Sequence, residues 1–177
     1  EIVLAPYGNE RKCKIHFIHG DMTPEEIHGL YTHPKIKAFS TITHGEGYGL
    51  PIFEAAYSGL PVIAPAWSGQ NDFLYAPVKN EKSGKVKNTP LFEKVKFAIA
   101  PVQKEVVWEG VITQEAQWCY PDPDSYKKKL RDVYKGLNYR NVMANGLQAH
   151  VKENFSEDII CNKYLDVFNP YVDTSKD

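Results

Sequence analysis

The sequence predicts an α/β fold with a doubly wound parallel sheet. Strand-like and helix-like segments alternate over residues 14–65, and the last of them, the strand PVIAP, is apolar throughout. A wholly apolar strand is typical of a parallel sheet that helices cover on both faces. Alternating strands and helices form right-handed crossovers between parallel strands, which build a sheet of this kind.

Each element of this first half has a local signal. Thr23 can cap a helix that has Pro24 at its first position, and Gly59 can end a second helix that Pro61 prevents from continuing. The expected elements are a strand over Lys14–Gly20, a helix after Thr23, a strand over Ile36–Thr43, a helix over Leu50–Ser58 and a strand over residues 61–65.

The second half is less regular. Residues 75–92 are polar and rich in lysine, which predicts an exposed loop or insertion. KVKFAIAPV (residues 94–102) and EVVWEGVI (residues 105–112) are strand-like. Helices are expected over residues 122–137, 141–155 and 156–168, the last with Ser156 as its N-cap.

The composition is ordinary for one globular domain over residues 1–177, with a formal net charge of −1. Neither nucleic acid nor an anionic membrane is favoured by such a charge, and no apolar run is long enough to span a bilayer. Three widely spaced cysteines (Cys13, Cys119 and Cys161) without a C-x-x-C pair favour a reducing cytosol over a disulfide framework. We therefore expect a cytoplasmic protein without a nucleic-acid partner.

The segment HGEGYGLPIFEAAYSGLPVIAP, residues 44–65, carries the chemistry. Gly45, Gly47 and Gly49 allow the backbone to turn sharply and to approach a ligand closely. The N–H groups and positive dipole end of the following helix, over residues 49–53, form a site for a phosphate or diphosphate. Glu54 can accept hydrogen bonds from a ribose diol, and Glu46 can reach whatever the phosphate carries. The two acids are thus expected to lie apart along one ligand.

This segment resembles the E-x7-E signature of retaining GT-B glycosyltransferases, which reads roughly E-G-F-G-L-P-x-x-E-A-x-x-x-G-x-P-V-I. Residues 46–63 read E-G-Y-G-L-P-I-F-E-A-A-Y-S-G-L-P-V-I. A looser resemblance covers residues 14–74, 117–134 and 153–168. It implies a Rossmann-like domain that is one half, the C-terminal donor-binding half, of a GT-B enzyme.

The resemblance also implies roles for single residues. Glu54 would hold the ribose of a UDP-, GDP- or ADP-linked sugar, and Glu46 would be the catalytic residue near the reacting carbon. Gly47, Tyr48, Gly49 and Leu50 would lie against the diphosphate and sugar. A hexosyl group would pass, with retention of configuration, to a sugar, glycan or lipid-linked acceptor, as in polysaccharide or glycoconjugate biosynthesis. No metal or other cofactor is implied.

The chain departs from the family pattern at three places. The family loop G-G-x-x-E is here Ser68-Gly69-Gln70-Asn71-Asp72, so donor contacts by Ser68, Gly69 and Asp72 are expected with altered detail. Arg11 and Lys12 are adjacent and do not match the family's basic pair. The acceptor-binding N-terminal domain has no room in this length, so we expect little transferase activity from the chain alone.

Several residues have two interpretations. His44 either contacts the donor or caps a strand end. Cys13, His16 and His19 do not suit one metal ion, since positions 16 and 19 of a strand face opposite ways, and Asp122-Pro123-Asp124 suits helix capping better than a metal. The lysine-rich stretch Lys79–Lys96 is expected to be solvated, with contact to an anionic acceptor or a membrane surface as the alternative. Trp108 and Trp118 are expected as core or interface anchors rather than sugar platforms.

Two other functions remain open. One is a nucleotide-sugar-binding module, or pseudoenzyme subunit, that catalyses nothing. The other is a sugar-nucleotide epimerase of the GT-B fold. Glu46 favours the transferase over the first alternative, and the string E-G-Y-G-L-P favours it over the second.

Overall fold

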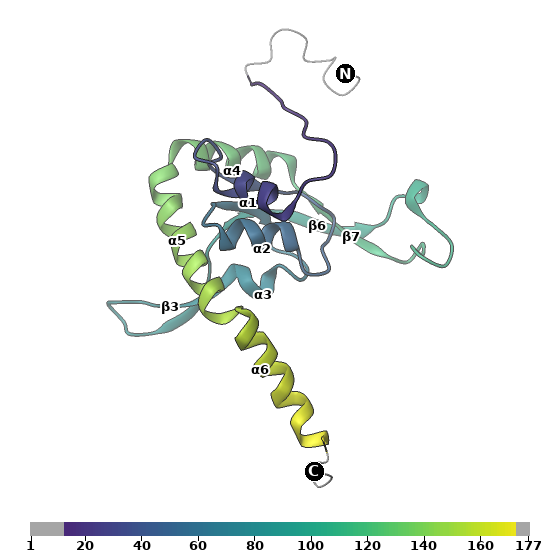
Figure 1. Cartoon of the computed structure of the whole chain (residues 1–177). Helices are drawn as coiled ribbons and strands as arrows, with labels where there is room; N and C mark the ends of the chain where they lie inside the picture. The colour runs from purple at the N-terminus through teal and green to yellow at the C-terminus, as the bar shows by residue number, and fades with distance from the viewer. Residues whose placement is uncertain (1–12, 173–177) are drawn as a thin grey trace.

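The computed structural model describes residues 13–172, and within that range the chain is a mixed α/β protein (Figure 1). It has six α-helices, a three-stranded parallel sheet and two antiparallel two-stranded sheets among these residues. The helices are α1 (Pro24–Thr32), α2 (Leu50–Tyr57), α3 (Asn71–Leu74), α4 (Pro123–Lys135), α5 (Leu137–Asn154) and α6 (Glu157–Phe168).

The parallel sheet lies at the centre of the body. Its strands are β1 (Phe39–Ser40), β2 (Val62–Pro65) and β5 (Glu93–Val95), in the order β1-β2-β5. The register pairs Phe39 with Val62 and Ile63 with Glu93. All four residues of β2 are buried, as its apolar sequence predicts for a central strand.

Helices cover both faces of this sheet. Val62 and Ala64 pack into a core cluster with side chains of α2, α3 and α5. Ile63 points the other way and packs with Val133 of α4, because successive side chains of a strand face opposite sides. The layered arrangement expected from the sequence is therefore present around three strands, two of them shorter than four residues.

The predicted ends of α1, α2 and α4 are largely confirmed, whereas α5 begins at Leu137 and not at the predicted position 141. Thr23 caps α1 in a capping box, in which its Oγ1 accepts from the N–H of Glu26 at 3.3 Å and Glu26 Oε2 accepts from the N–H of Thr23 at 2.9 Å. Gly59, just after α2, has a φ of +79°. Asp122 caps α4 by accepting from the N–H of Ser125. Ser156 precedes α6 as expected, but its side chain makes no cap hydrogen bond.

Two predicted strands are wrong. Lys14–Gly20 forms no strand and leads into α1 with Phe17 81% and Ile18 63% exposed, since no neighbouring strand pairs with it. In residues 105–112, a 3₁₀ turn (Lys104–Val106) and one bridge between Trp108 and Ile112 replace the expected strand. Gly110, with a φ of +77°, turns the chain back on itself there.

Two hairpins project from the body (Figure 1). β3 (Tyr75–Lys79) and β4 (Val86–Pro90) pair where the sequence predicted an exposed loop. The Asn80 side chain closes their turn by accepting from the N–H groups of Lys82 and Ser83. β6 (Phe97–Pro101) and β7 (Gln117–Pro121) form the second hairpin, and residues 97–121 are called the arm below.

Helix α6 extends away from the body (Figure 1), and none of its residues is buried. Across residues 13–172, none of the helices combines the length and the apolar character needed to cross a bilayer.

Candidate functional site

The site is built where two loops meet after neighbouring parallel strands. One loop joins β1 to α2 and carries Glu46, and the other follows β2 and carries Ser68. Ser68 Oγ donates to the backbone oxygen of Glu46 at 2.5 Å, and the N–H of Gly69 donates to the same oxygen at 3.4 Å. Ser68 holds a φ of +70°, a left-handed conformation that costs free energy in a residue other than glycine.

Gly69 allows the closest approach between the loops. A Cβ added there would lie 2.0 Å from the backbone oxygen of Gly47, well inside van der Waals contact. The glycine is therefore required for the loops to meet. This is a packing role, whereas the sequence predicted contact with a donor.

The start of α2 uses two of the N–H donors predicted there. Gly49 is the N-cap with a φ of +87°, and its backbone oxygen accepts from the N–H groups of Ile52 and Phe53, each at 2.9 Å. Pro51 has no N–H. Of the donors expected over residues 49–53, the N–H groups of Ile52 and Phe53 are therefore used at the helix start.

The unpaired donors include those of Gly49 and Leu50 and begin two residues before the predicted range. Within residues 13–172, the N–H groups of residues 47–50 make no hydrogen bond. Successive N–H groups beside a left-handed residue form a concave site for an anion, and the positive end of the α2 dipole adds to it.

Glu46 borders an open cavity of about 410 Å³ at the root of the arm. The cavity is lined by residues of both loops and of the arm, namely His44, Gly45, Glu46, Gly47, Trp67, Ser68, Gln117 and Trp118. No Lys, Arg or His lies within ion-pair distance of Glu46 in the described part of the chain. Its carboxylate is free to accept hydrogen bonds from a ligand.

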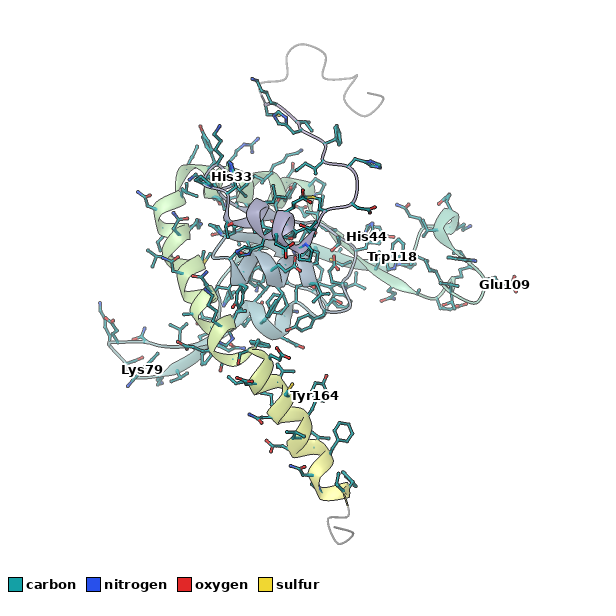
Figure 2. The ribbon with its side chains drawn as sticks, in the orientation of Figure 1. His33, His44, Lys79, Glu109, Trp118 and Tyr164 are labelled. Atoms are coloured by element: carbon teal, nitrogen blue, oxygen red, sulfur yellow. The ribbon has the colours of Figure 1, made fainter. Side chains whose placement is uncertain are left out.

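His44 joins the β1–α2 loop to the arm. Its ring stacks on Trp118 with centroids 4.9 Å apart and 16° between the planes, and Tyr120 meets it edge-on at 4.9 Å (Figure 2). Nδ1 lies 2.6 Å from the backbone oxygen of Cys119. Because a carbonyl oxygen can only accept, Nδ1 carries the proton and Nε2 is left for another partner.

Glu54 lies in a different cavity. This second space, also of about 410 Å³, is a groove between α1 and α2. Its lining is mostly apolar and aromatic: Pro24, Ile27, His28, Tyr31, Phe53, Glu54, Tyr57 and Ser58. Burial, together with the neighbouring Glu54 carboxylate, raises the pKa of the Tyr31 hydroxyl. The structure thus separates the two glutamates, as the sequence predicted, and excludes a direct carboxylate pair.

The remaining predicted residues lie around the loops. Tyr48 packs its ring against Phe53 and Phe73, with centroids 5.7 Å and 5.2 Å away, and lines neither cavity. Burial, with a smaller contribution from Asp72, raises the pKa of Tyr48. Leu50 is 62% exposed at the first position of α2.

One wall of each cavity comes from residues that the motif does not predict. Gln117 and Trp118 reach the first from the arm, and His28 and Tyr31 reach the second from α1. None of these positions follows from the motif, because each lies in a separate segment of the chain. Trp67 could have been predicted at the cavity from the sequence, since it directly precedes the loop at Ser68.

Metal binding finds no support in residues 13–172, which contain no group of three His, Cys, Asp or Glu side chains placed to hold an ion. Asp122 is engaged in capping α4, and Asp124 pairs with Lys127 at 3.3 Å. Arg11 and Lys12 lie outside the described residues.

In comparisons with known proteins, no family model and no curated protein matches this chain.

Proposed function

We propose that this chain is the donor-binding domain of a retaining GT-B glycosyltransferase. The observation that carries the proposal is the arrangement of two carboxylates and a set of unpaired N–H groups around α2. Glu46 and Glu54 lie in separate cavities, and the N–H groups between them, over residues 47–50, have no partner among the described residues. Two acceptors in separate cavities, with the anion site formed by residues that lie between them in the sequence, match the parts of a nucleotide sugar.

Each part of the ligand has a chemical counterpart. The N–H groups of residues 47–50 and the positive end of α2 bind the diphosphate. The ribose hydroxyls donate to Glu54, and the nucleoside lies in the groove beside Tyr31 and His28, where aromatic and apolar side chains favour a flat base. The sugar lies near Glu46, and the departing phosphate helps to take the acceptor's proton. The protein's share of catalysis is positioning and charge stabilisation.

The fold gives further support. The chain β1–loop–α2–β2 puts the motif after one parallel strand and before the next, which is where open α/β sheets bind ligands. Helices on both faces of the sheet agree with a Rossmann-like, doubly wound domain. An acceptor-binding domain would complete the enzyme and choose the sugar, glycan or lipid-linked acceptor.

One observation favours a second candidate, a nucleotide-sugar-binding module without catalysis. Neither cavity is lined by a Lys or Arg among the described residues, whereas the family uses such a pair to grip the diphosphate. Binding without transfer, even after an acceptor domain is joined to the chain, would support this candidate over the transferase.

Calorimetric titration with UDP, GDP and ADP tests the donor site. We expect saturable binding of one nucleotide, weakened about 10- to 100-fold in Glu54→Ala because hydrogen bonds to a charged acceptor are lost. Glu109→Ala is the matched control, since Glu109 lies exposed at the tip of the arm (Figure 2). Absence of binding to all three nucleotides, or equal affinity in Glu54→Ala, would contradict the proposal.

A further inference from the structure

The cavity beside Glu46 has the lining of a sugar site. Two tryptophan rings, Trp67 and Trp118, form apolar walls, while Glu46 and Gln117 supply polar groups. A pyranose ring has C–H faces that pack on aromatic rings and an edge of hydroxyls that need donors and acceptors. The mixture of residues matches both requirements at once.

The Trp118 wall is held in place before any ligand arrives. Its ring stacks on His44, whose Nδ1 is fixed 2.6 Å from the Cys119 oxygen. The N–H of Cys119 donates back to the His44 oxygen at 3.1 Å. A side chain fixed in this way loses little rotamer entropy on binding.

The Trp67 wall also contacts the arm. Trp67 packs against Phe97, the first residue of β6, with ring centroids 6.0 Å apart. The Trp67 indole nitrogen would lie 3.7 Å from a Cβ at Gly45, which shows how close the ring comes to the β1–α2 loop. The arm therefore lines the cavity through Gln117 and Trp118 of β7 and contacts its Trp67 wall through Phe97 of β6. Its tip, with Trp108 66% exposed, points away (Figure 2).

We propose that the arm determines sugar specificity: Trp118 packs against the ring of a nucleotide-linked pyranose while Glu46 and Gln117 bond its hydroxyls. This inference rests on the proposed donor function and goes beyond it. It assigns Trp118 a binding role instead of the anchoring role that the sequence suggested. Trp108, at the tip, takes no part in donor binding.

The first test compares each nucleotide with its sugar conjugate: UDP with UDP-glucose, GDP with GDP-mannose and ADP with ADP-glucose. In the unmodified chain, we expect one conjugate to bind more tightly than its nucleotide by about 3- to 10-fold, the range expected for an aromatic contact. Trp118→Leu should remove this preference and leave affinity for the nucleotide alone unchanged. Trp108→Leu, on the same arm, should keep the preference.

The second test needs no change at the cavity. The chain has three tryptophans, so in Trp108→Phe both remaining indoles line the cavity. Titration with the preferred conjugate should shift their emission, whereas the nucleotide alone should change it much less. This measurement still tests whether the sugar contacts the cavity if Trp118→Leu fails to fold.

The outcomes separate the two proposals. If a nucleotide binds but its sugar conjugate gains nothing, or if Trp118→Leu folds and keeps the preference, the arm does not determine sugar specificity and the donor site still stands. An equal emission change for nucleotide and conjugate would overturn the inference in the same way. If no nucleotide or conjugate binds, the donor function itself fails and the inference falls with it.

Discussion

Gly69 and Gly47 face each other where the two loops of the site meet, and they have opposite requirements. Gly69 has no space for a side chain, because its Cβ would lie 2.0 Å from the Gly47 oxygen. Gly47 has no atom within 4 Å of where its own Cβ would lie. One glycine therefore serves the packing of the loops, and the other leaves the surface open to a ligand.

This contrast predicts different phenotypes for two similar substitutions. Gly69→Ala should lower the free energy of unfolding by about 1–3 kcal/mol, since backbone must move to admit the methyl group. Gly47→Ala should leave stability nearly unchanged but weaken nucleotide binding. Urea denaturation and calorimetry measure the two effects. A stable Gly69→Ala with normal loop geometry would show that the loops do not meet as described.

Single residues differ in how far the sequence predicts them. Glu46 and Glu54 were predicted as site residues from their spacing, because both belong to one continuous motif. Part of the donor range predicted at the start of α2 is used within the helix, since the 3₁₀-type bond from Ile52 to Gly49 is a detail of local geometry. Trp118 was predicted only as a core or interface anchor, because its stacking on His44 joins positions that are distant in sequence.

Among the elements, β5 is tied to α4 and α5 by a charged side chain. Glu93 of β5 is only 5% exposed. Lys129 of α4 donates to its Oε2 at 2.7 Å, and Arg140 of α5 forms an ion pair with its Oε1, although the Arg140 Nε lacks hydrogen-bond geometry. A buried carboxylate requires such partners.

Removing one member of this group should be costly. We expect Glu93→Ala to lower the free energy of unfolding by about 3 kcal/mol, because two partly buried cations lose their counter-charge. The exposed pair of Asp124 and Lys127 provides the control, and Lys127→Ala should cost less than about 0.5 kcal/mol. Chemical denaturation of both variants measures the two losses in the free energy of unfolding and compares them. Similar losses in the two variants would mean that Glu93 does not join these elements.

Helices and strands were predicted correctly where local sequence signals were strong. The predictions failed where the pairing of one strand with another determines whether a strand forms. Caps and breakers gave α1, α2 and α4 their ends, and the apolar run gave β2. Lys14–Gly20 has the pattern of a strand, but a strand exists only beside a neighbour, which this segment lacks. The β3–β4 hairpin was missed for the converse reason, since its polar sequence has little to bury yet finds a partner strand through a tight turn.

At the scale of the whole molecule, the packed body and its projections are separate parts. The last aromatic ring of the C-terminal region that joins the core is Phe155. Beyond it, α6 leaves Tyr164, Leu165 and Phe168 more than half exposed, and its polar link to α5 is a long contact of 3.5 Å from Lys163 to the Asn154 oxygen. Exposed apolar surface of this extent favours association with other molecules.

A chain that ends at Ser156 tests this division. Because α6 buries no residue, its removal should change the free energy of unfolding by less than about 1 kcal/mol, which corresponds to about 2–4 °C in melting temperature for a domain of this size. Sedimentation velocity should show less self-association than the full chain at the same concentration, since the exposed aromatic and aliphatic side chains are gone. Nucleotide affinity should stay unchanged, because neither cavity includes a residue of α6. A large drop in melting temperature would instead mean that α6 packs on the body in solution and contributes to its stability.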